Sequence, residues 1–168
     1  MNYTIGISAS AVSHVGMIKA ENEDNFYLNG RFIHEYETDS VQVSIENNSS
    51  EYLFAVSDGM DRRMPDKNMP VSIIRDLKKL HEKIKGSSKG IQVKFELLRE
   101  CVSEANNLIY SFSLGNAFEK RGGPSFAGLL LSENKAALLT SGNARIYMVR
   151  DSSIKQLPSD SRKAERLL

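Results

Sequence analysis

The spacing of apolar residues changes twice along this 168-residue chain, and this change limits the folds open to it. Two middle segments, residues 71–85 and 92–112, place apolar side chains at steps of three and four, which predicts two amphipathic helices. A stretch of Gly, Ser and Lys at 86–90 is typical of a flexible connection between them. Short, strand-like apolar runs lie on both sides of this pair. This order, strands then helices then strands, favours an α+β fold over alternating βαβ units.

The part of the chain before the helices holds runs typical of strands, at residues 3–9, 25–28, 31–36, 42–45 and 52–56. Asn29-Gly30 lies between the second and third of these runs and is the strongest short signal for a β-hairpin. The polar residues 47–50 predict a loop. The last run is continuously apolar, with aromatic and β-branched members, which is typical of a strand buried on both faces.

Four more short apolar runs follow the helices, at residues 126–131, 136–140, 145–149 and 154–157. The breaks between them are rich in Ser, Asn, Asp and Gly, which predicts an antiparallel meander. Residues 161–168 are polar with a basic lean and show no sign of a finishing strand. Because no linker divides the chain, we expect residues 1–168 to form one domain, with a sheet-rich core and helices packed on a face.

Charge and hydropathy argue against two classes of partner. The chain has 22 Lys and Arg against 21 Asp and Glu, whereas nucleic-acid binding needs a basic excess on one face. The longest apolar runs have about five residues, far from the roughly 20 that span a bilayer. We therefore expect neither nucleic acid nor a membrane as a partner. The N-terminus has no basic segment followed by an apolar one, so we expect a cytoplasmic protein.

Histidine and cysteine give weaker signals. His14, His34 and His81 have no cysteine or carboxylate at the spacing of a zinc site. The lone cysteine, Cys101, cannot form an internal disulfide, which also suits the cytosol. It lies on the apolar stripe of the second predicted helix, so we expect it in the core rather than as a nucleophile.

Two acidic clusters stand where a strand is expected to begin or end. Asn22-Glu23-Asp24 precedes one short run, and Asp58-Gly59 follows the most apolar one. A carboxylate at the end of a buried strand is held rigidly, and a following glycine lets the backbone turn and expose its carbonyl oxygen. Hard divalent cations bind oxygens of this kind. From spacing alone, a plain turn and a solvated loop explain the same residues.

Five segments carry a further pattern, at residues 13–24, 53–60, 123–127, 141–147 and 156–161. The first contains Gly-x-x-Lys-x-x-Asn-Glu-Asp, and the second is an apolar strand followed by Asp-Gly-Met. The others read Gly-Pro-Ser-Phe-Ala, Ser-Gly-Asn-Ala-Arg-Ile-Tyr and Gln-Leu-Pro-Ser-Asp-Ser. In this order, with two helices between the second and third, they resemble the motifs of the metal-dependent protein phosphatases (PPM, type 2C). The resemblance covers nearly the whole chain.

The resemblance implies a fold and a reaction. The fold is α+β, with two antiparallel β-sheets packed as a sandwich and flanked by helices, and this chain would lack its last strands. The reaction uses two Mg²⁺ or Mn²⁺ ions, whose shared water attacks a phosphoserine or phosphothreonine. By position, Asp58 would bridge the ions, while Glu23 and the Gly59 carbonyl would hold one of them. Asp24 would orient metal-bound waters, and Lys19 would bind the phosphate.

Several residues depart from the family pattern. Lys19 stands in place of an arginine and keeps its charge without the bidentate fork. Asp61-Arg62 replaces a glycine pair. Asn143 replaces an aspartate that the family can use for an additional metal, and Ser161 replaces a histidine.

The chain reaches Leu168 before two later aspartate motifs of the family. We therefore expect it to furnish about half of the metal ligands and to bind divalent cations weakly. A sheet without its last strands leaves an edge uncovered, which would favour self-association. Two functions stay open: a metal-dependent serine/threonine phosphatase acting on a phosphoprotein, and a catalytically inactive phosphatase-like module, a pseudophosphatase, that binds or regulates a partner.

Overall fold

The computed structural model describes residues 4–18, 22, 24–34, 39–58, 73–115, 125–157 and 166–167. The strands before the helices are β1 (Ile5–His14), β2 (Asn25–Leu28), β3 (Arg31–Phe32), β4 (Ser40–Ser49) and β5 (Glu51–Ser57). The helices are α1 (Ile73–Ile84) and α2 (Ile91–Gly115). The later strands are β6 (Phe126–Ser132), β7 (Lys135–Ser141), β8 (Ile146–Arg150), β9 (Ser153–Leu157) and β10 (Arg166–Leu167).

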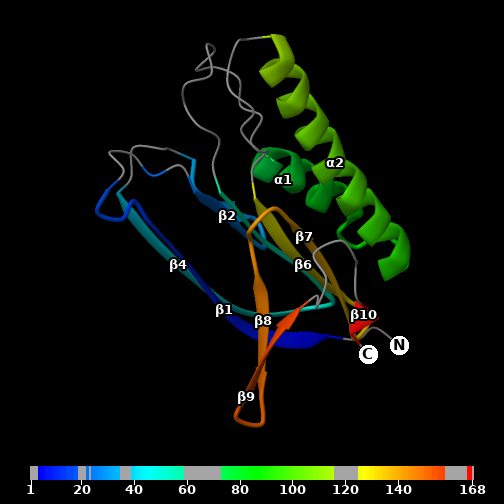
Figure 1. The fold of residues 1–168 in the computed structure, drawn as a ribbon. Coiled ribbons are helices and arrows are strands. Elements are labelled where there is room, and N and C mark those ends of the chain that lie inside the picture. Colours follow the sequence, from blue (N-terminus) through cyan, green and yellow to red (C-terminus); the bar gives the residue numbers. More distant parts are fainter. Residues whose placement is uncertain are drawn as a thin grey trace.

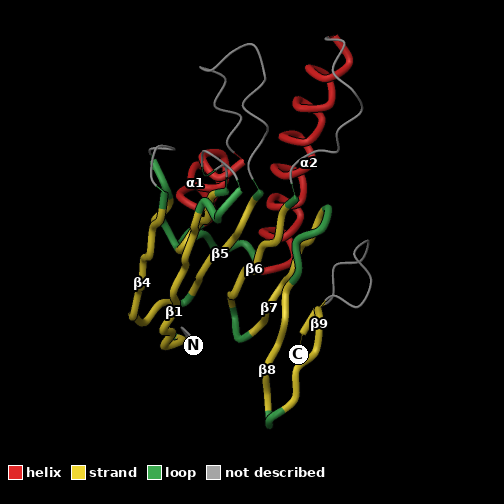
Figure 2. Tube along the Cα trace, turned by 60° about the vertical axis from the view of Figure 1, so that its left-hand side comes forward, coloured by secondary structure: helices red, strands yellow, loops and turns green. Residues whose placement is uncertain are grey.

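The largest sheet has the strand order β10-β7-β6-β5-β2-β3, and every neighbouring pair in it is antiparallel. β1 and β4 form a second sheet, paired from Ile5 opposite Ser49 to His14 opposite Ser40. β8 and β9 form a separate hairpin. Figures 1 and 2 show both helices on one side of the large sheet and the β1–β4 sheet on the other. The large sheet is therefore the middle layer.

The alternation of side chains along β5 divides the core in two. Leu53 and Ala55 join the cluster under the helices, with Leu77 of α1 and Leu98 of α2. Phe54 lies on the opposite face and joins a second cluster, which fills the space between the two sheets. That cluster consists of Phe26, Leu28 and Ile33, packed with Phe54, Ala9, Ala11, Val41, Val43 and Ile45. Apolar packing on both faces thus fixes the central strands.

Polar contacts inside the core tie the helices to the strands. Glu51 and Lys94, 2% and 4% exposed, form an ion pair between β5 and α2. The Tyr27 hydroxyl of β2 lies 2.8 Å from Nδ1 of His81 in α1. His81 Nε2 lies 3.9 Å from Glu51 Oε1. Burial, with the nearby positive charges of Lys85 and Lys94, lowers the pKa of His81 to about 4. His81 is therefore neutral at neutral pH.

The helices and the hairpin at Asn29-Gly30 form where the sequence predicts them. Three turns have positive φ at both central residues, the type I′ geometry: Asn29 and Gly30, Glu133 and Asn134, Asp151 and Ser152. This geometry matches the right-handed twist of the flanking strands, and it sets the registers of β2–β3, β6–β7 and β8–β9. Neither described helix is long and apolar enough to cross a membrane.

The predicted loop at residues 47–50 is wrong, because β4 continues to Ser49 and pairs with β1 over its whole length. The strand expected at 3–9 likewise extends to His14. The buried Tyr52 hydroxyl lies 2.7 Å and 2.8 Å from the carbonyl oxygens of Asn47 and Ile5. Pairing with β1 and this contact therefore outweigh the low strand propensity of the polar residues.

Three other strand predictions need correction. β5 is not buried on both faces throughout, because Val56 near its end is 50% exposed. The predicted meander is interrupted, since β7 pairs with β6 and β10 whereas β8 pairs with β9. β10 itself contradicts the expectation of no finishing strand, because it pairs with β7 at Ala136 and Ala137. A polar segment can form backbone hydrogen bonds at a sheet edge, and its sequence then shows no apolar pattern that would predict a strand.

Candidate functional site

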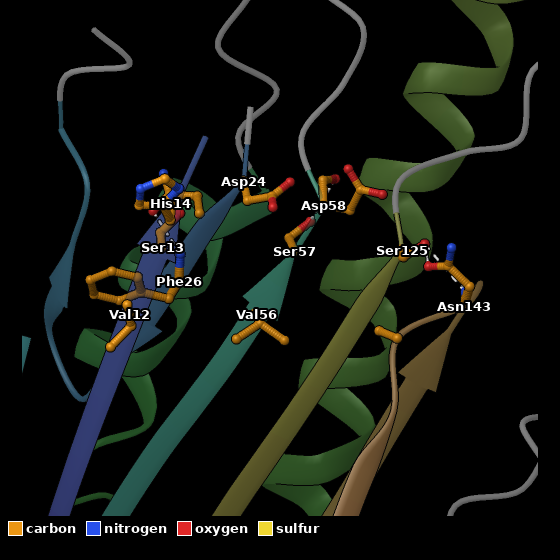
Figure 3. Close-up of a pocket in the computed structure, with 12 residues that line it drawn as sticks. Val12, Ser13, His14, Asp24, Phe26, Val56, Ser57, Asp58, Ser125 and Asn143 are labelled. Carbon is orange, nitrogen blue, oxygen red and sulfur yellow. Dashed lines mark hydrogen bonds between the residues drawn. The ribbon is translucent and has the colours of Figure 1, made fainter. Parts of the chain in front are cut away.

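Asp24 and Asp58 lie at the same end of the large sheet, on neighbouring strands. β2 begins directly after Asp24, and β5 ends directly before Asp58. Asn25 pairs with Ser57, so one further step in the antiparallel register places Asp24 opposite Asp58. Figure 3 shows both carboxyl groups above the ends of these strands. Like charges in neighbouring cross-strand positions repel each other, and a bound cation would relieve that repulsion.

The backbone at Asp58 is fixed by the neighbouring strand β6. The Asp58 N–H donates to the carbonyl oxygen of Ser125 at 3.0 Å. The Ser57 hydroxyl donates to the Asp58 carbonyl at 3.4 Å, and both serines are buried. The end of β5 is therefore held in place although it lies at the rim of the sheet.

The approach to Asp24 is anchored by two asparagines. Asn22 is 5% exposed; its Nδ2 donates to Ser13 Oγ at 2.8 Å, and its Oδ1 accepts the Asp24 N–H at 3.1 Å. Asn25 exchanges two hydrogen bonds of 3.0 Å with the backbone of Ile33. These anchoring roles go beyond what the sequence predicts. Asparagines next to a carboxylate are the available signal, because their side chains commonly bond to nearby backbone.

A cavity of about 280 Å³ opens at this end of the sheet. Its lining consists of Val12, Ser13, His14, Asp24, Asn25, Phe26, Val56, Ser57, Asp58, Ser125, Asn143 and Ala144. Val12, Phe26 and Val56 come from the strands, while the polar members come from the strand ends and, with Ala144, from the turn after β7. Figure 3 shows the polar residues in a row above Val12 and Val56. The cavity therefore has an apolar floor and a polar, partly acidic rim.

Ser125 and Asn143 form the wall next to Asp58. The Ser125 hydroxyl donates to Asn143 Oδ1 at 2.5 Å and accepts the Asn143 backbone N–H at 3.3 Å. Gly142 has a φ of +70°, and a Cβ there would lie 2.7 Å from Ser125 Oγ. Only glycine suits both this conformation and this close approach. The turn after β7 is consequently pressed against the start of β6.

His14, the last residue of β1, forms the opposite wall. Its Nδ1 accepts the N–H of Gly16 at 2.8 Å. An acceptor nitrogen carries no proton, so the proton of the neutral ring is on Nε2. The sequence gives His14 no role, since no ligand spacing surrounds it, and the structure places it in the cavity wall.

The structure brings together two of the predicted site residues, Asp24 and Asp58. Lys19, Glu23 and Gly59 lie outside the described residues, and their roles stay predictions. Within the part of the chain that the structure describes, no group of three or more His, Cys, Asp or Glu side chains gathers around a point. Two carboxylates with nearby serine hydroxyls are a set of hard oxygen donors, which suits Mg²⁺ or Mn²⁺ better than a soft metal.

Cys101 has the environment of a structural cysteine. It packs against the core cluster under the helices. Burial, with negative charge from Asp76 and Glu104, raises the pKa of its thiol to about 11. A thiol with such a pKa is a poor nucleophile at neutral pH, in agreement with the predicted core position. The buried Glu51–Lys94 pair has no sequence signal, because charged residues are rarely found buried.

Comparisons with known proteins identify the fold. No protein-family model and no curated protein matches the chain. Among solved structures, PppA, a key regulatory component of T6SS in Pseudomonas aeruginosa, matches with 20% identity and a TM-score of 0.60. The serine/threonine phosphatase Stp1 from Staphylococcus aureus matches with 18% identity and a TM-score of 0.60. The catalytic domain of the phosphatase PstP, in complex with 2 manganese ions, matches with 18% identity and a TM-score of 0.57.

These matches cover 94%, 93% and 94% of the chain, but only 58%, 54% and 57% of the respective structures. The chain therefore spans little more than half the length of the structures that it resembles. It has the α+β fold of the PPM-type serine/threonine phosphatases, as its motifs predict. At these identities the likeness establishes the fold, and activity is a separate question.

Proposed function

We propose that the chain is a metal-dependent protein phosphatase that hydrolyses phosphoserine and phosphothreonine. The observation that carries this proposal is the pair of carboxylates, Asp24 and Asp58, which two neighbouring strands deliver to one cavity. The fold supports it, because the solved structures that share this fold include serine/threonine phosphatases.

Each site residue has a proposed part. Asp58, with Glu23 and the Gly59 carbonyl, would hold two Mg²⁺ or Mn²⁺ ions, and Asp24 would orient the water bound to them. Bound ions of this kind supply a water acidic enough to attack phosphorus at neutral pH. Lys19 would bind the phosphate as a single positive charge.

The hydrogen bonds around the two aspartates are already formed in the chain without substrate. Ser125 fixes the backbone of Asp58, and Asn22 fixes the backbone of Asp24. The main chain that carries each carboxylate is thereby preorganised, so a binding cation has only the two side chains to order.

Phosphate release from a phosphoserine peptide in the presence of Mn²⁺ tests the proposal. Asp58→Asn keeps the shape and removes the charge, so we expect turnover to fall by at least about 100-fold. Asp151→Asn is the matched control, because Asp151 lies in the β8–β9 turn with a φ of 49°, which asparagine readily adopts. Equal turnover by wild type and Asp58→Asn, or no Mn²⁺-dependent turnover by wild type, would contradict the proposal.

A second candidate is a catalytically inactive module that keeps the fold and binds a partner. The observation that favours it is the amide of Asn143 at the cavity rim, where the motif resemblance places an aspartate. A module of this kind would unfold at the same temperature with and without Mn²⁺, in wild type and in Asp58→Asn alike. A phosphatase site would instead be stabilised by Mn²⁺ in wild type only.

The remaining assignments are also proposals. The partner would be a phosphoprotein rather than nucleic acid or a membrane, and the compartment the cytosol. Self-association through an uncovered sheet edge would appear as a mass that rises with concentration in light scattering.

A further inference from the structure

The orientation of the Asn143 side chain is fixed by its contacts with Ser125. The serine hydroxyl has a single proton, and at 2.5 Å from Asn143 Oδ1 it donates that proton to the amide oxygen. The serine oxygen in turn accepts the backbone N–H of Asn143. The amide oxygen is therefore the atom that faces Ser125, with one of its two lone pairs used, and both N–H groups of Nδ2 lie on the other branch of the amide. Figure 3 shows the amide oxygen toward Ser125 and the nitrogen pointing up, away from the strands.

Two hydrogen bonds hold the turn that carries Asn143 against Ser125. Ser125 is buried at the start of β6, and its backbone carbonyl already accepts the N–H of Asp58. Gly142 brings the turn so close that there is no room for a side chain between them. One serine thus contacts both the backbone of Asp58 and the amide at the rim, which holds these two members of the cavity lining in one arrangement.

The charge of the cavity distinguishes an amide at position 143 from a carboxylate. Asp24 and Asp58 are acidic members of this lining, and an aspartate at position 143 would add a third. An amide instead leaves the charge unchanged and offers N–H groups, which hydrogen-bond well to anionic oxygens. The rim at Asn143 therefore carries N–H donors that suit an anionic oxygen.

We propose that Asn143 is a substrate-binding residue, whose Nδ2 donates to a phosphoryl oxygen held next to Asp58. This inference rests on the proposed function, and it names the group that receives the phosphate on the β6–β7 side of the cavity. Ser125 is its positioning residue: the hydroxyl orients the amide and does not itself contact the phosphate.

The test titrates inorganic phosphate into the ¹⁵N-labelled full chain, with and without saturating Mg²⁺, which is diamagnetic. The Asn143 side-chain amide gives a pair of NMR signals that Asn143→Asp removes, and this variant therefore assigns them. Phosphate should shift these signals and leave those of Asn134, in the β6–β7 turn, in place.

The same titrations of the variants measure the affinities for phosphate and Mg²⁺. A purely structural role of Asn143 would not change these two affinities in opposite directions. Asn143→Asp retains an acceptor for the Ser125 hydroxyl, so the fold is preserved, but it replaces the donor by a charge. We expect phosphate affinity to fall about tenfold and Mg²⁺ affinity to rise. Ser125→Ala should weaken phosphate binding about threefold, because the amide loses its fixed orientation. Asn134→Asp makes the same chemical change in an exposed turn and should alter neither affinity.

Unchanged phosphate affinity in Asn143→Asp would overturn the inference, and so would the failure of the wild type to bind phosphate under either condition. Failure of the proposed function has a different signature. In that case, Mg²⁺ affinity would be absent or insensitive to Asp58→Asn, while the Asn143 signals still respond to phosphate.

Discussion

The buried His81 makes the stability of the fold depend on pH in one direction. Its pKa is about 4 in the folded chain, against 6.5 for an ordinary histidine. Between these values the unfolded chain binds a proton that the folded chain does not. Stability is therefore complete above about pH 6.5, decreases as the pH falls toward 4, and loses nothing more from this residue below 4.

The size of the effect follows from the shift. A lowering by about 2.5 pKa units, at about 1.4 kcal/mol for each, corresponds to roughly 3 kcal/mol of unfolding free energy. The groups that face the ring are Tyr27 from β2, Glu51 from β5, and Lys85 and Lys94 near the helix ends. A loss of this size is a large fraction of the roughly 5–15 kcal/mol that stabilises an ordinary domain.

Urea unfolding between pH 7.5 and 4, followed by circular dichroism, measures this loss. His81→Gln keeps a polar partner for the Tyr27 hydroxyl and removes the titration, so its stability should fall by about 3 kcal/mol less than that of wild type over the same range. His34→Gln changes an exposed histidine and should follow wild type. If His81→Gln loses as much stability as wild type, the assignment of the pH dependence to His81 is refuted.

Three further changes test the packing of the fold. Gly142→Ala should lower the free energy of unfolding in urea by about 1 kcal/mol more than Gly86→Ala. Both glycines have positive φ (+70° and +71°), but only a side chain at 142 would collide with Ser125. Equal losses of stability would contradict this. Lys94→Met should cost about 3–5 kcal/mol by leaving the Glu51 carboxylate buried without its cation, and a loss below 1 kcal/mol would contradict a buried ion pair. Cys101, whose pKa is about 11, should react with a thiol reagent at pH 8 far more slowly than free cysteine; equal rates would show it to be accessible.

The sequence predicts those parts of the fold whose signals are local. Asn29-Gly30 determines its own turn, and the apolar stripes of α1 and α2 are visible within each helix. Asp24 and Asp58 can each be placed at a strand end from local patterns, whereas their meeting depends on the pairing of β2 with β5, which the motif resemblance alone implies.

The parts that the sequence misses depend on partners far along the chain. The polar residues 47–49 become a strand because β1 pairs with them, and β10 exists because the edge of β7 is available. The contact between Ser125 and Asn143 joins residues 18 positions apart, and no local pattern signals it. These strands and this contact depend on pairing between distant segments, which local sequence patterns do not predict.

Calorimetric titration with Mn²⁺ measures whether Asp24 and Asp58 belong to one cation site. We expect wild type and Asp151→Asn to bind Mn²⁺ alike, while Asp24→Asn and Asp58→Asn each lower the affinity at least about tenfold. Equal Mn²⁺ affinity in all four proteins would contradict it, because the two carboxylates would then have no part in holding the metal.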